Sequence, residues 1–280
     1  LDLLAEPENW QQPLVRKMIV ERLAQRYAAA GSDADFECCA RLLALAPGEA
    51  ETAMLITGMG KGLQGRKRDA VPAALEAPLA KLWNAGPPDP TLIRFAIRLG
   101  SADAHDEALR QVTDNNVPEK TRLLLLQVLG QIGRDESVEA LLPLLDDATP
   151  VAVRGGVLQA LQRFQSPKIP STVLGRYAKM PPELKSKARS LLCGRVEWAG
   201  DLLEAVARGD IPASDVPNDQ LQQIAFHKDE DLNQLIEKHW GRVVGGESPG
   251  EKAAKVHGIA VSLGLKPGDP VKGKELVTKT

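Results

Sequence analysis

The segment DATPVAVRGGVLQAL, residues 147–161, decides the fold of this chain of 280 residues. Within it, Pro150 is followed four residues later by Arg154 and then by a run of small and aliphatic residues. A proline in the first turn of a helix loses no hydrogen bond and fixes φ near its helical value, so Pro150 marks a helix start. We predict a helix over 151–164 that ends at a turn over 165–167.

The same arrangement recurs along the chain at a nearly constant spacing. The prolines lie 28, 32 and 32 residues apart, and the first three are each followed four residues later by an arginine: Pro90, Arg94, Pro118, Arg122, Pro150, Arg154 and Pro182. A single pair of short helices cannot bury its apolar face alone, whereas stacked pairs bury one continuous core. The order of Asp, Pro, Val-Arg and an Ala/Leu run resembles the HEAT-repeat pattern. We therefore predict an all-α fold, a HEAT-like α-solenoid of stacked antiparallel helix pairs; an irregular helical bundle is the alternative.

Composition and charge narrow both the fold and the function. Hydrophobic residues make up 43% of the chain and charged residues 26%, which is typical of a folded protein. Aromatic residues make up only 4%, which disfavours an all-β fold because strands favour aromatic and β-branched side chains. The net charge of −2 disfavours binding to nucleic acid, and no apolar run is long enough to predict a membrane span.

Turn signals divide the chain into three parts. The stretch GPPDP at residues 86–90 is a stiff break. We expect an N-terminal helical region over 1–86, HEAT-like repeats over 87–241, and a C-terminal helical linker over 242–280. Apolar residues at helical spacing predict helices at 13–30, 35–45, 49–62, 71–83, 119–132, 137–145, 151–164, 171–180, 182–193, 197–207, 219–226, 229–240 and 250–263.

Three local motifs have structural explanations that we prefer to functional ones. Asp33 or Asp35 is expected to cap the second helix. The glycines of GMGKG at residues 58–62 lack the spacing of a phosphate-binding loop, so helix capping and a turn explain them better. The basic run RKR at residues 66–68 is interpreted as a solvated loop, because nucleic-acid binding would need further basic residues in phase on one face.

The arginines of the repeat have two competing interpretations. In the first, each arginine pairs with an aspartate that precedes it, so that Asp114 serves Arg122, and Asp146 or Asp147 serves Arg154. In the second, the arginines form a stripe that binds anions. We prefer the ladder of ion pairs within the repeats. The arginines concerned are Arg94, Arg98, Arg122, Arg154 and Arg176.

No spacing in the chain supports a catalytic, cofactor-binding or metal site, so we expect no catalytic residue, cofactor or metal and no enzyme activity. The cysteines Cys38, Cys39 and Cys193 lie among apolar neighbours and form no CxxC, which indicates buried thiols; a reactive thiol or metal ligand is the alternative. The four histidines are not spaced as a ligand set. His239, beside Trp240, is interpreted as structural.

Several stretches, taken together in order and spacing, resemble the helical region of the PVC-type haem-binding CxxCH proteins. They are residues 35–47, AIRLG at 96–100, WAGDLL at 198–203, KHWG at 238–241, PGEK at 249–252 and GDPVKGKEL at 268–276. The resemblance covers essentially the whole chain. It implies a parent protein with a β-propeller that resembles membrane-bound dehydrogenases, then a HEAT-like helical region, then a c-type cytochrome domain.

The resemblance implies a function in which this chain itself catalyses no reaction. We expect a fragment of a longer periplasmic or otherwise extracytoplasmic redox protein, in which the helical region is a non-catalytic scaffold between the propeller and the cytochrome domain. Its partners are then the flanking domains of the same chain, and haem c is expected beyond Thr280. A free-standing protein–protein interaction adaptor is one alternative, and a nucleic-acid-binding helical-repeat protein is a second.

Overall fold

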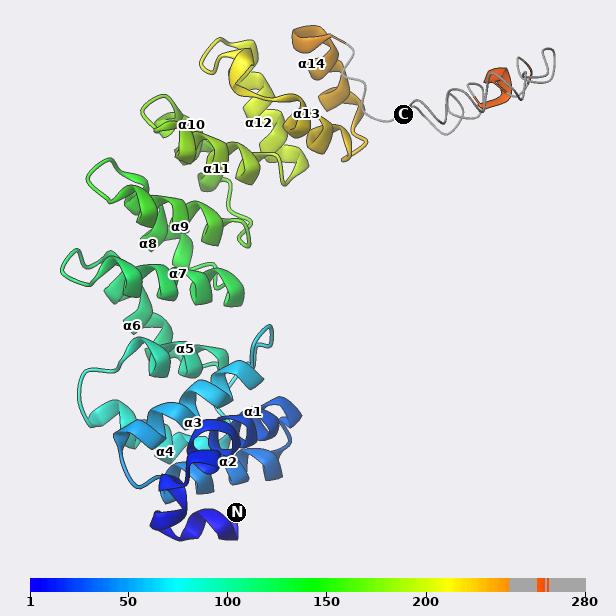
Figure 1. Cartoon of the computed structure of the whole chain (residues 1–280). Coiled ribbons are helices and arrows are strands. Elements are labelled where there is room, and N and C mark those ends of the chain that lie inside the picture. The colour runs from blue at the N-terminus through cyan, green and yellow to red at the C-terminus, as the bar shows by residue number, and fades with distance from the viewer. Residues whose placement is uncertain (242–255, 260, 262–280) are drawn as a thin grey trace, which may run out of the picture.

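The computed structural model describes residues 1–241, 256–259 and 261, and within them it contains helices and no strand. The helices form pairs that stack one on the next along one direction (Figure 1). The predicted all-α solenoid is therefore confirmed. The predicted linker helix over 250–263 lies mostly outside the described residues.

One layer of the stack consists of the odd-numbered helices. Each of these helices packs on the next one, from α1 through α11, and α13 joins α11 through the hydrogen bond from Arg189 Nε to Gln220 Oε1 of 2.7 Å. The members are α1 (Val20–Ala30), α3 (Glu49–Gly62), α5 (Pro90–Arg98), α7 (Glu119–Ile132), α9 (Val151–Leu161), α11 (Pro182–Leu192) and α13 (Asn218–Ala225).

The even-numbered helices form the second layer. Contacts join α2 to α4, α6 to α8, α10 to α12 and α12 to α14, while a 3-10 segment, η4 (Leu142–Leu145), bridges α9 and α10. The members are α2 (Asp33–Leu45), α4 (Ala73–Asn84), α6 (Ala102–Thr113), α8 (Ser137–Leu141), α10 (Lys168–Tyr177), α12 (Val196–Ala207) and α14 (Glu230–Trp240). Shorter turns lie at η1 (Asp2–Ala5), η2 (Pro7–Gln11), the π-helical η3 (Val15–Ile19) and η5 (Ala213–Asp215).

The repeat prolines stand at the starts of the odd-numbered helices. Pro90 and Pro182 are the first residues of α5 and α11, whereas Pro118 and Pro150 occupy the N-cap positions of α7 and α9, with ψ of 138° and 142°. A proline at either place gives up no helical hydrogen bond, because these first N–H groups have no partner within the helix.

The buried side chains form two clusters that meet at α5. Leu92, Phe95 and Leu99 face the cluster of the N-terminal helices, whereas Ile93 and Ile97 face the cluster that extends through α14. A helix that is apolar on two faces can serve both cores. The division of the chain at residue 86 stays a prediction, since α5, which follows it, contributes to both clusters.

Glycine allows an unusually close approach of α1 to α3. A Cβ at Gly58 would overlap the backbone oxygen of Glu21, and one at Gly62 would overlap the backbone oxygen of Gln25. Backbone atoms cannot rotate aside as a side chain can. Glycine at both positions is therefore required for the spacing between these two helices.

Local details differ from the predictions at three places. The N-cap of α2 is Ser32, not an aspartate: its Oγ accepts from the Asp35 N–H at 3.2 Å, and the Asp35 carboxylate accepts from the Ser32 N–H at 3.1 Å. Residues predicted as the start of the first helix form the π-helical turn η3. The helix predicted over 137–145 becomes 3-10 at Leu142, because Pro143 has no N–H with which to continue the α-helical pattern.

Candidate functional site

The arginines of the repeat fall into two groups with different surroundings. Arg154 forms the predicted ion pair, with its Nη1 2.5 Å from Asp147 Oδ1. Arg122 does not pair with Asp114: its Nε donates to the backbone oxygen of Val112 at 2.8 Å and its Nη1 to Asn115 Oδ1 at 3.1 Å. Both arginines hold the loop that precedes their helix, so the interaction is structural in both repeats.

Arg176 is a third structural case. Its Nη1 donates to the backbone oxygen of Leu142 at 3.3 Å, which ties α10 to the preceding repeat. The predicted ion pair is therefore wrong at Arg122, where a backbone oxygen and the Asn115 amide oxygen replace Asp114, and Arg176 likewise donates to a backbone oxygen. A backbone carbonyl oxygen can accept a hydrogen bond from a guanidinium with the same geometry as a carboxylate oxygen. The two kinds of pair differ in net charge.

Arg94 and Arg98 belong to a different environment on α5. The Arg94 Nε is buried and has no hydrogen-bond partner among the described residues, as is also true of Arg122 Nη2 and Arg154 Nε, so the difference lies in Arg98 and in the absence of an acceptor for the rest of the Arg94 guanidinium. Arg98 is only 5% exposed, and its Nη2 donates to the neutral Gln131 Oε1 at 2.9 Å, while its Nη1 lies 3.4 Å from the Arg94 backbone oxygen. Burial, and secondly the charge of Arg94, lower the pKa of Arg98. Within the described residues no carboxylate compensates either guanidinium.

These two arginines line a groove, the α5–α9 groove, that follows the odd-numbered layer and the loop between α3 and α4. It consists of three adjoining hollows of about 230, 810 and 130 Å³. Its cationic lining residues are Lys61, Arg66, Lys67, Arg94, Arg98 and Arg163, its amide residues are Gln64, Gln127, Gln131, Gln159 and Gln162, and none of its lining residues is an aspartate or a glutamate.

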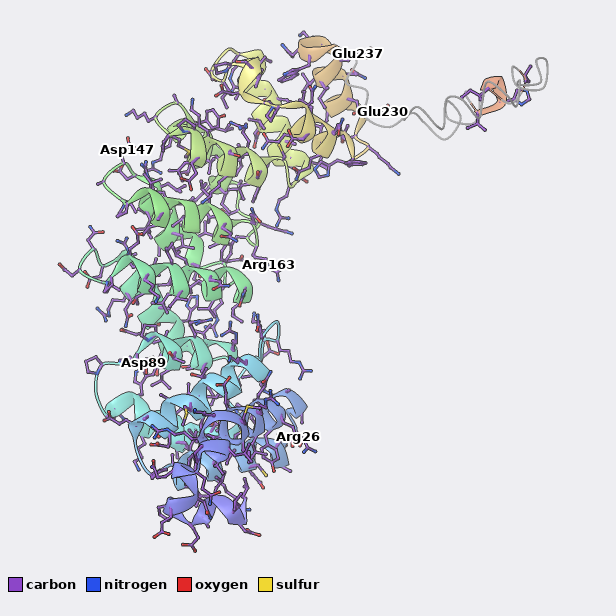
Figure 2. All side chains as sticks on the ribbon, viewed as in Figure 1. Arg26, Asp89, Asp147, Arg163, Glu230 and Glu237 are labelled. Carbon is purple, nitrogen blue, oxygen red and sulfur yellow. The ribbon has the colours of Figure 1, made fainter. Side chains whose placement is uncertain are left out.

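The groove lies away from the edge of the stack on which the loop-holding arginines act. Asp89 and Asp147, which precede α5 and α9, lie on one edge, and Arg163, which follows α9, lies on the other (Figure 2). Acidic residues before helices and basic residues after them complement the helix dipoles. At these positions the acidic residues lie before α5 and α9, on the opposite edge of the stack from Arg163.

The amide groups of the groove are free for a ligand. In the described part of the chain, only Gln131 among the five glutamines uses its side chain in a hydrogen bond, and it does so as the acceptor for Arg98. Gln127 on α7 and Gln159 on α9 lie 32 residues apart, on adjacent helices of the odd-numbered layer, and both are exposed. Between them α7 and α9 approach closely, because Gly130 packs directly on Ala160, and these small residues form the floor of the groove.

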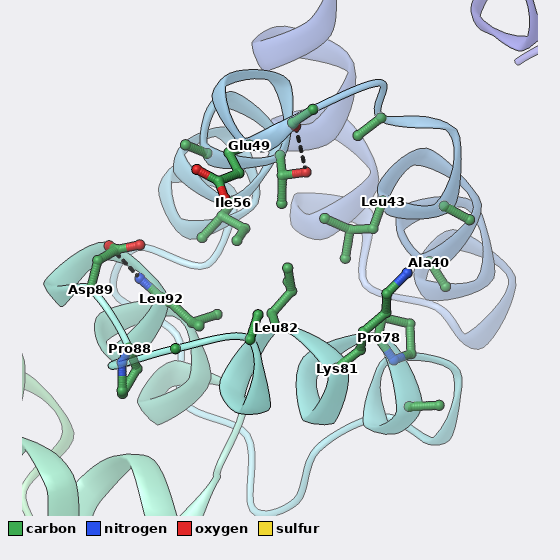
Figure 3. A pocket seen from close by; sticks show the side chains of 18 of the residues that line it. Ala40, Leu43, Glu49, Ile56, Pro78, Lys81, Leu82, Pro88, Asp89 and Leu92 are labelled. Atoms are coloured by element: carbon green, nitrogen blue, oxygen red, sulfur yellow. Dashed lines mark hydrogen bonds between the residues drawn. The ribbon is translucent and has the colours of Figure 1, made fainter.

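A second hollow, of about 820 Å³, lies between α2, α3, α4 and the start of α5 (Figure 3). Its walls are mainly apolar, with Leu43, Ile56, Pro78 and Leu82 pointing toward its centre. Polar groups stand at its rim: Glu49, Lys81 and Asp89. Asp89 is engaged as the N-cap of α5, accepting from the Thr91 and Leu92 N–H groups at 2.6 and 3.2 Å.

The cysteines and histidines sit in structural positions. Cys39 and Cys193 are buried, and burial raises the pKa of each thiol to about 12, while Cys38 is half-buried. His105 Nε2 lies 2.9 Å from Ser137 Oγ, and His227 Nε2 lies 2.9 Å from the Cys193 backbone oxygen. The described residues contain no cluster of His, Cys, Asp or Glu able to hold a metal ion.

Two tryptophan side chains donate hydrogen bonds to backbone oxygens of other segments. Trp10 is fully buried and its Nε1 donates to the Leu4 backbone oxygen at 2.8 Å, and Trp240 donates in the same way to Ala213 at 3.0 Å. His239 lies edge-on to Trp240, with ring centroids 5.9 Å apart. These rings join neighbouring segments of the chain.

Comparison with known proteins identifies the repeat in the middle of the chain. The family of HEAT repeats matches residues 107–193, which contain α7 to α11. No curated protein and no solved structure matched the chain. Among the described residues, no helix is both long and apolar enough to cross a membrane. HEAT repeats fit a helical scaffold or a role in protein interactions, and their fold is typically non-catalytic.

Sequence reasoning missed the groove because its residues come from distant parts of the chain. The loop at Gln64 to Lys67 reaches the end of α5, where the Arg68 N–H donates to the Arg98 backbone oxygen at 3.1 Å. Two signals were available: the anion-binding alternative for the arginines, which includes Arg94 and Arg98, and the alignment of Gln127 with Gln159, since polar residues that recur at the repeat period lie on one face of the stack.

Proposed function

We propose that the chain is a non-catalytic spacer that holds two flanking domains of a larger protein at a fixed separation. The observation that carries this proposal is the shape of the stack: the N-terminus and α14 lie at opposite ends of a continuous series of packed helices (Figure 1). Because each helix pair packs on its neighbours along the whole length, the distance between the ends is set by the structure rather than by a flexible linker.

The finer part of the proposal concerns the domains that are joined. The sequence resemblance supports a propeller related to membrane-bound dehydrogenases on one side and a c-type cytochrome domain on the other, in an extracytoplasmic electron-transfer protein. Haem c would belong to the cytochrome domain, because this chain contains no CxxCH sequence to form the two thioether bonds and the axial histidine bond.

Two measurements test this function separately. The reading frame that continues beyond Thr280 is expected to encode CxxCH, and the protein expressed with that continuation is expected to show the absorption bands of covalently bound haem after denaturation. A continuation without CxxCH would remove the redox role. Distances between spin labels on exposed residues of η1 and α14 are expected to form one narrow distribution; a broad one would remove the spacer.

A free-standing adaptor is a second candidate, and the apolar hollow of Figure 3 favours it. A mainly apolar hollow of about 820 Å³ has the volume of sites that hold another molecule. The adaptor would bind a separate polypeptide through this hollow, whereas a spacer needs no such binding site. A substitution of the exposed Lys81 or of Leu82 to glutamate would then abolish co-purification of a partner without changing the spin-label distances.

A further inference from the structure

The α5–α9 groove collects positive charge without the negative charge that usually accompanies it. Of its six cationic residues, only Lys61 forms an ion pair, with Glu21. The other five, Arg66, Lys67, Arg94, Arg98 and Arg163, have no carboxylate partner among the described residues. Like charges gathered in a hollow raise the local concentration of anions.

The buried guanidinium of Arg98 is the sharpest feature of the groove. It is 5% exposed and lies beside Arg94, whose Nε has no hydrogen-bond partner in the described part of the chain. A buried charge costs free energy unless a counter-charge or hydrogen bonds compensate it. The neutral oxygens of Gln131 and of the Arg94 backbone satisfy part of the hydrogen bonding and none of the charge.

Helix dipoles explain only part of this arrangement. Lys61 and Arg98 lie in the last turns of α3 and α5, where the carbonyl ends carry about half a negative charge. Arg94 lies in the middle of α5, and Arg66 and Lys67 lie on a loop, so the dipoles do not account for them. Anionic groups in the groove would compensate the positive charge that the dipoles leave unbalanced.

The glutamines indicate what kind of anion fits. A primary amide carries both a donor and an acceptor, so it matches the N–H and C=O of a peptide group. Gln127 and Gln159 follow each other on α7 and α9 with free side chains, and the floor between them is formed by Gly130 and Ala160. An extended backbone can therefore lie along the groove with its carbonyl and N–H groups toward these amides.

We propose that the α5–α9 groove binds an extended acidic peptide segment of a partner protein. Its Asp or Glu carboxylates pair with Arg94, Arg98 and Arg163, and its backbone hydrogen-bonds to Gln127 and Gln159. Guanidinium groups bind carboxylates in a bidentate manner, which fixes the register of the peptide along the helices. This binding is independent of the proposed spacer role, so either can fail without the other.

Nucleic acid is the less favoured occupant of the same groove. Single strands are usually held by aromatic side chains that stack on bases, and the only aromatic residue that lines the groove is Phe95, which is 1% exposed. Duplex DNA requires many phosphate contacts, whereas this chain is acidic overall, with a net charge of −2.

The test is fluorescence anisotropy with the whole chain of 280 residues and a labelled decapeptide of alternating Glu and Ser. Matched probes are the same peptide with Gln for Glu and a labelled single-stranded oligonucleotide of ten thymidines. We expect binding of the acidic peptide that weakens with added salt, and at least tenfold weaker binding of the other two probes. Tighter binding of the oligonucleotide, equal binding of the amide peptide, or no binding of the acidic peptide would overturn the proposal.

Variants locate the binding in the groove. Arg163→Gln and Lys67→Gln change exposed side chains and should each weaken the acidic peptide several-fold, and Arg98→Met should weaken it about tenfold to a hundredfold. Lys168→Gln is the matched control, because Lys168 is an exposed cation at the start of α10 that pairs with Glu139 outside the groove. Binding that falls equally in the control and in the groove variants would contradict the proposal.

A stability measurement separates a ligand-binding role of Arg98 from a structural one. Removal of an uncompensated buried cation should leave the urea midpoint of Arg98→Met unchanged or higher, since a hydrophobic residue of similar length fills the same space. A large fall in the midpoint would show that Arg98 serves the fold. In that case the exposed variants Arg163→Gln and Lys67→Gln alone decide the proposal.

Discussion

The helices on the two sides of α5 build the same two-layer stack by different means. From α5 onward, prolines start the odd-numbered helices, and arginines at or near the helix starts, such as Arg122 and Arg154, fasten the preceding loops. Between α1 and α3 the spacing is set by glycines that let two backbones touch. A regular sequence period is therefore one route to this architecture, and close backbone packing is another.

Substitutions in α5, the helix that contributes to both buried clusters, are expected to lower the stability most. Phe95→Ala removes a side chain of the N-terminal cluster and Ile93→Ala one of the other cluster. The expected losses of unfolding free energy are about 3–5 and about 2–5 kcal/mol, because truncation of a buried side chain leaves a cavity. Urea unfolding followed by circular dichroism measures both.

The buried thiols report which cluster opens in these variants. Cys39 lies in the N-terminal cluster and Cys193 in the other, and each must be exposed before it reacts. In a Cys38→Ser background, Phe95→Ala should speed the labelling of Cys39 more than that of Cys193, and Ile93→Ala should do the reverse. Equal acceleration of both thiols would mean that the two clusters unfold as one unit.

The two modes of helix contact predict losses of stability of different size when a methyl group is added. Gly58→Ala should destabilise the chain by about 1–3 kcal/mol, because its Cβ meets the Glu21 backbone. Gly156→Ala should change stability by less than about 1 kcal/mol, because its Cβ meets the Leu123 side chain at 3.0 Å, which can move, and alanine favours the helix. Similar urea midpoints for the two variants would contradict this distinction.

Each side of α5 has an ion pair between a buried and an exposed residue. The buried partner is the anion before α5 and the cation after it. Arg16 pairs with the buried Glu51 at 3.6 Å, and the exposed Asp147 pairs with the buried Arg154 at 2.5 Å. Arg16→Gln and Asp147→Asn should each cost less than about 1 kcal/mol, because one partner of each pair is solvated. Added salt should reduce both differences, and a loss that is independent of salt would show that packing is responsible.

The pH dependence near neutrality should come from the part of the chain after α5, since all four histidines follow residue 100. Burial, and secondly the charge of Arg134, lower the pKa of His105, and Asp106 and Glu136 oppose this shift. The unfolded chain therefore binds the proton more readily, so His105 contributes stability above its ordinary pKa of about 6.5, and this contribution is lost as the pH falls below it.

Replacement of this group tests the assignment. His105→Gln retains a hydrogen-bonding partner for Ser137 and does not titrate. Its urea midpoint should fall less than that of the wild type between pH 7.5 and pH 5.5. An unchanged pH dependence would show that His105 is not its source.

Much of the fold follows from local sequence. The bounds of α3 and α7 agree with the predicted ranges 49–62 and 119–132. The left-handed Gly133 ends α7, whereas the glycines at 58–62 lie within α3, where Gly58 and Gly62 pack on α1, so the helix capping expected for them is wrong. The boundary errors have local causes as well: α10 begins three residues before the predicted Ser171, since Pro170 lies within its first turn.

The candidate site could not be predicted in this way. Its residues are far apart in the sequence, and a basic loop such as Arg66–Lys67–Arg68 has the same composition whether it faces solvent or a groove. Arg94 and Arg122 occupy the same phase of the repeat, yet the first lines the groove and the second holds a loop. Only the packing of α3 against α5 brings the loop to Arg98 and distinguishes the two arginines.

The neighbour-to-neighbour packing of the helix pairs gives the molecule the mechanics of a lever arm. A tilt of a degree or so between α3 and α5 would rotate every later pair as a rigid unit, and the displacement would grow with distance along the stack. A ligand that draws the α3–α4 loop toward α7 would therefore move α14 far more than it moves the loop itself. In a protein that places two domains opposite each other, such leverage converts a small local event into a change of their separation.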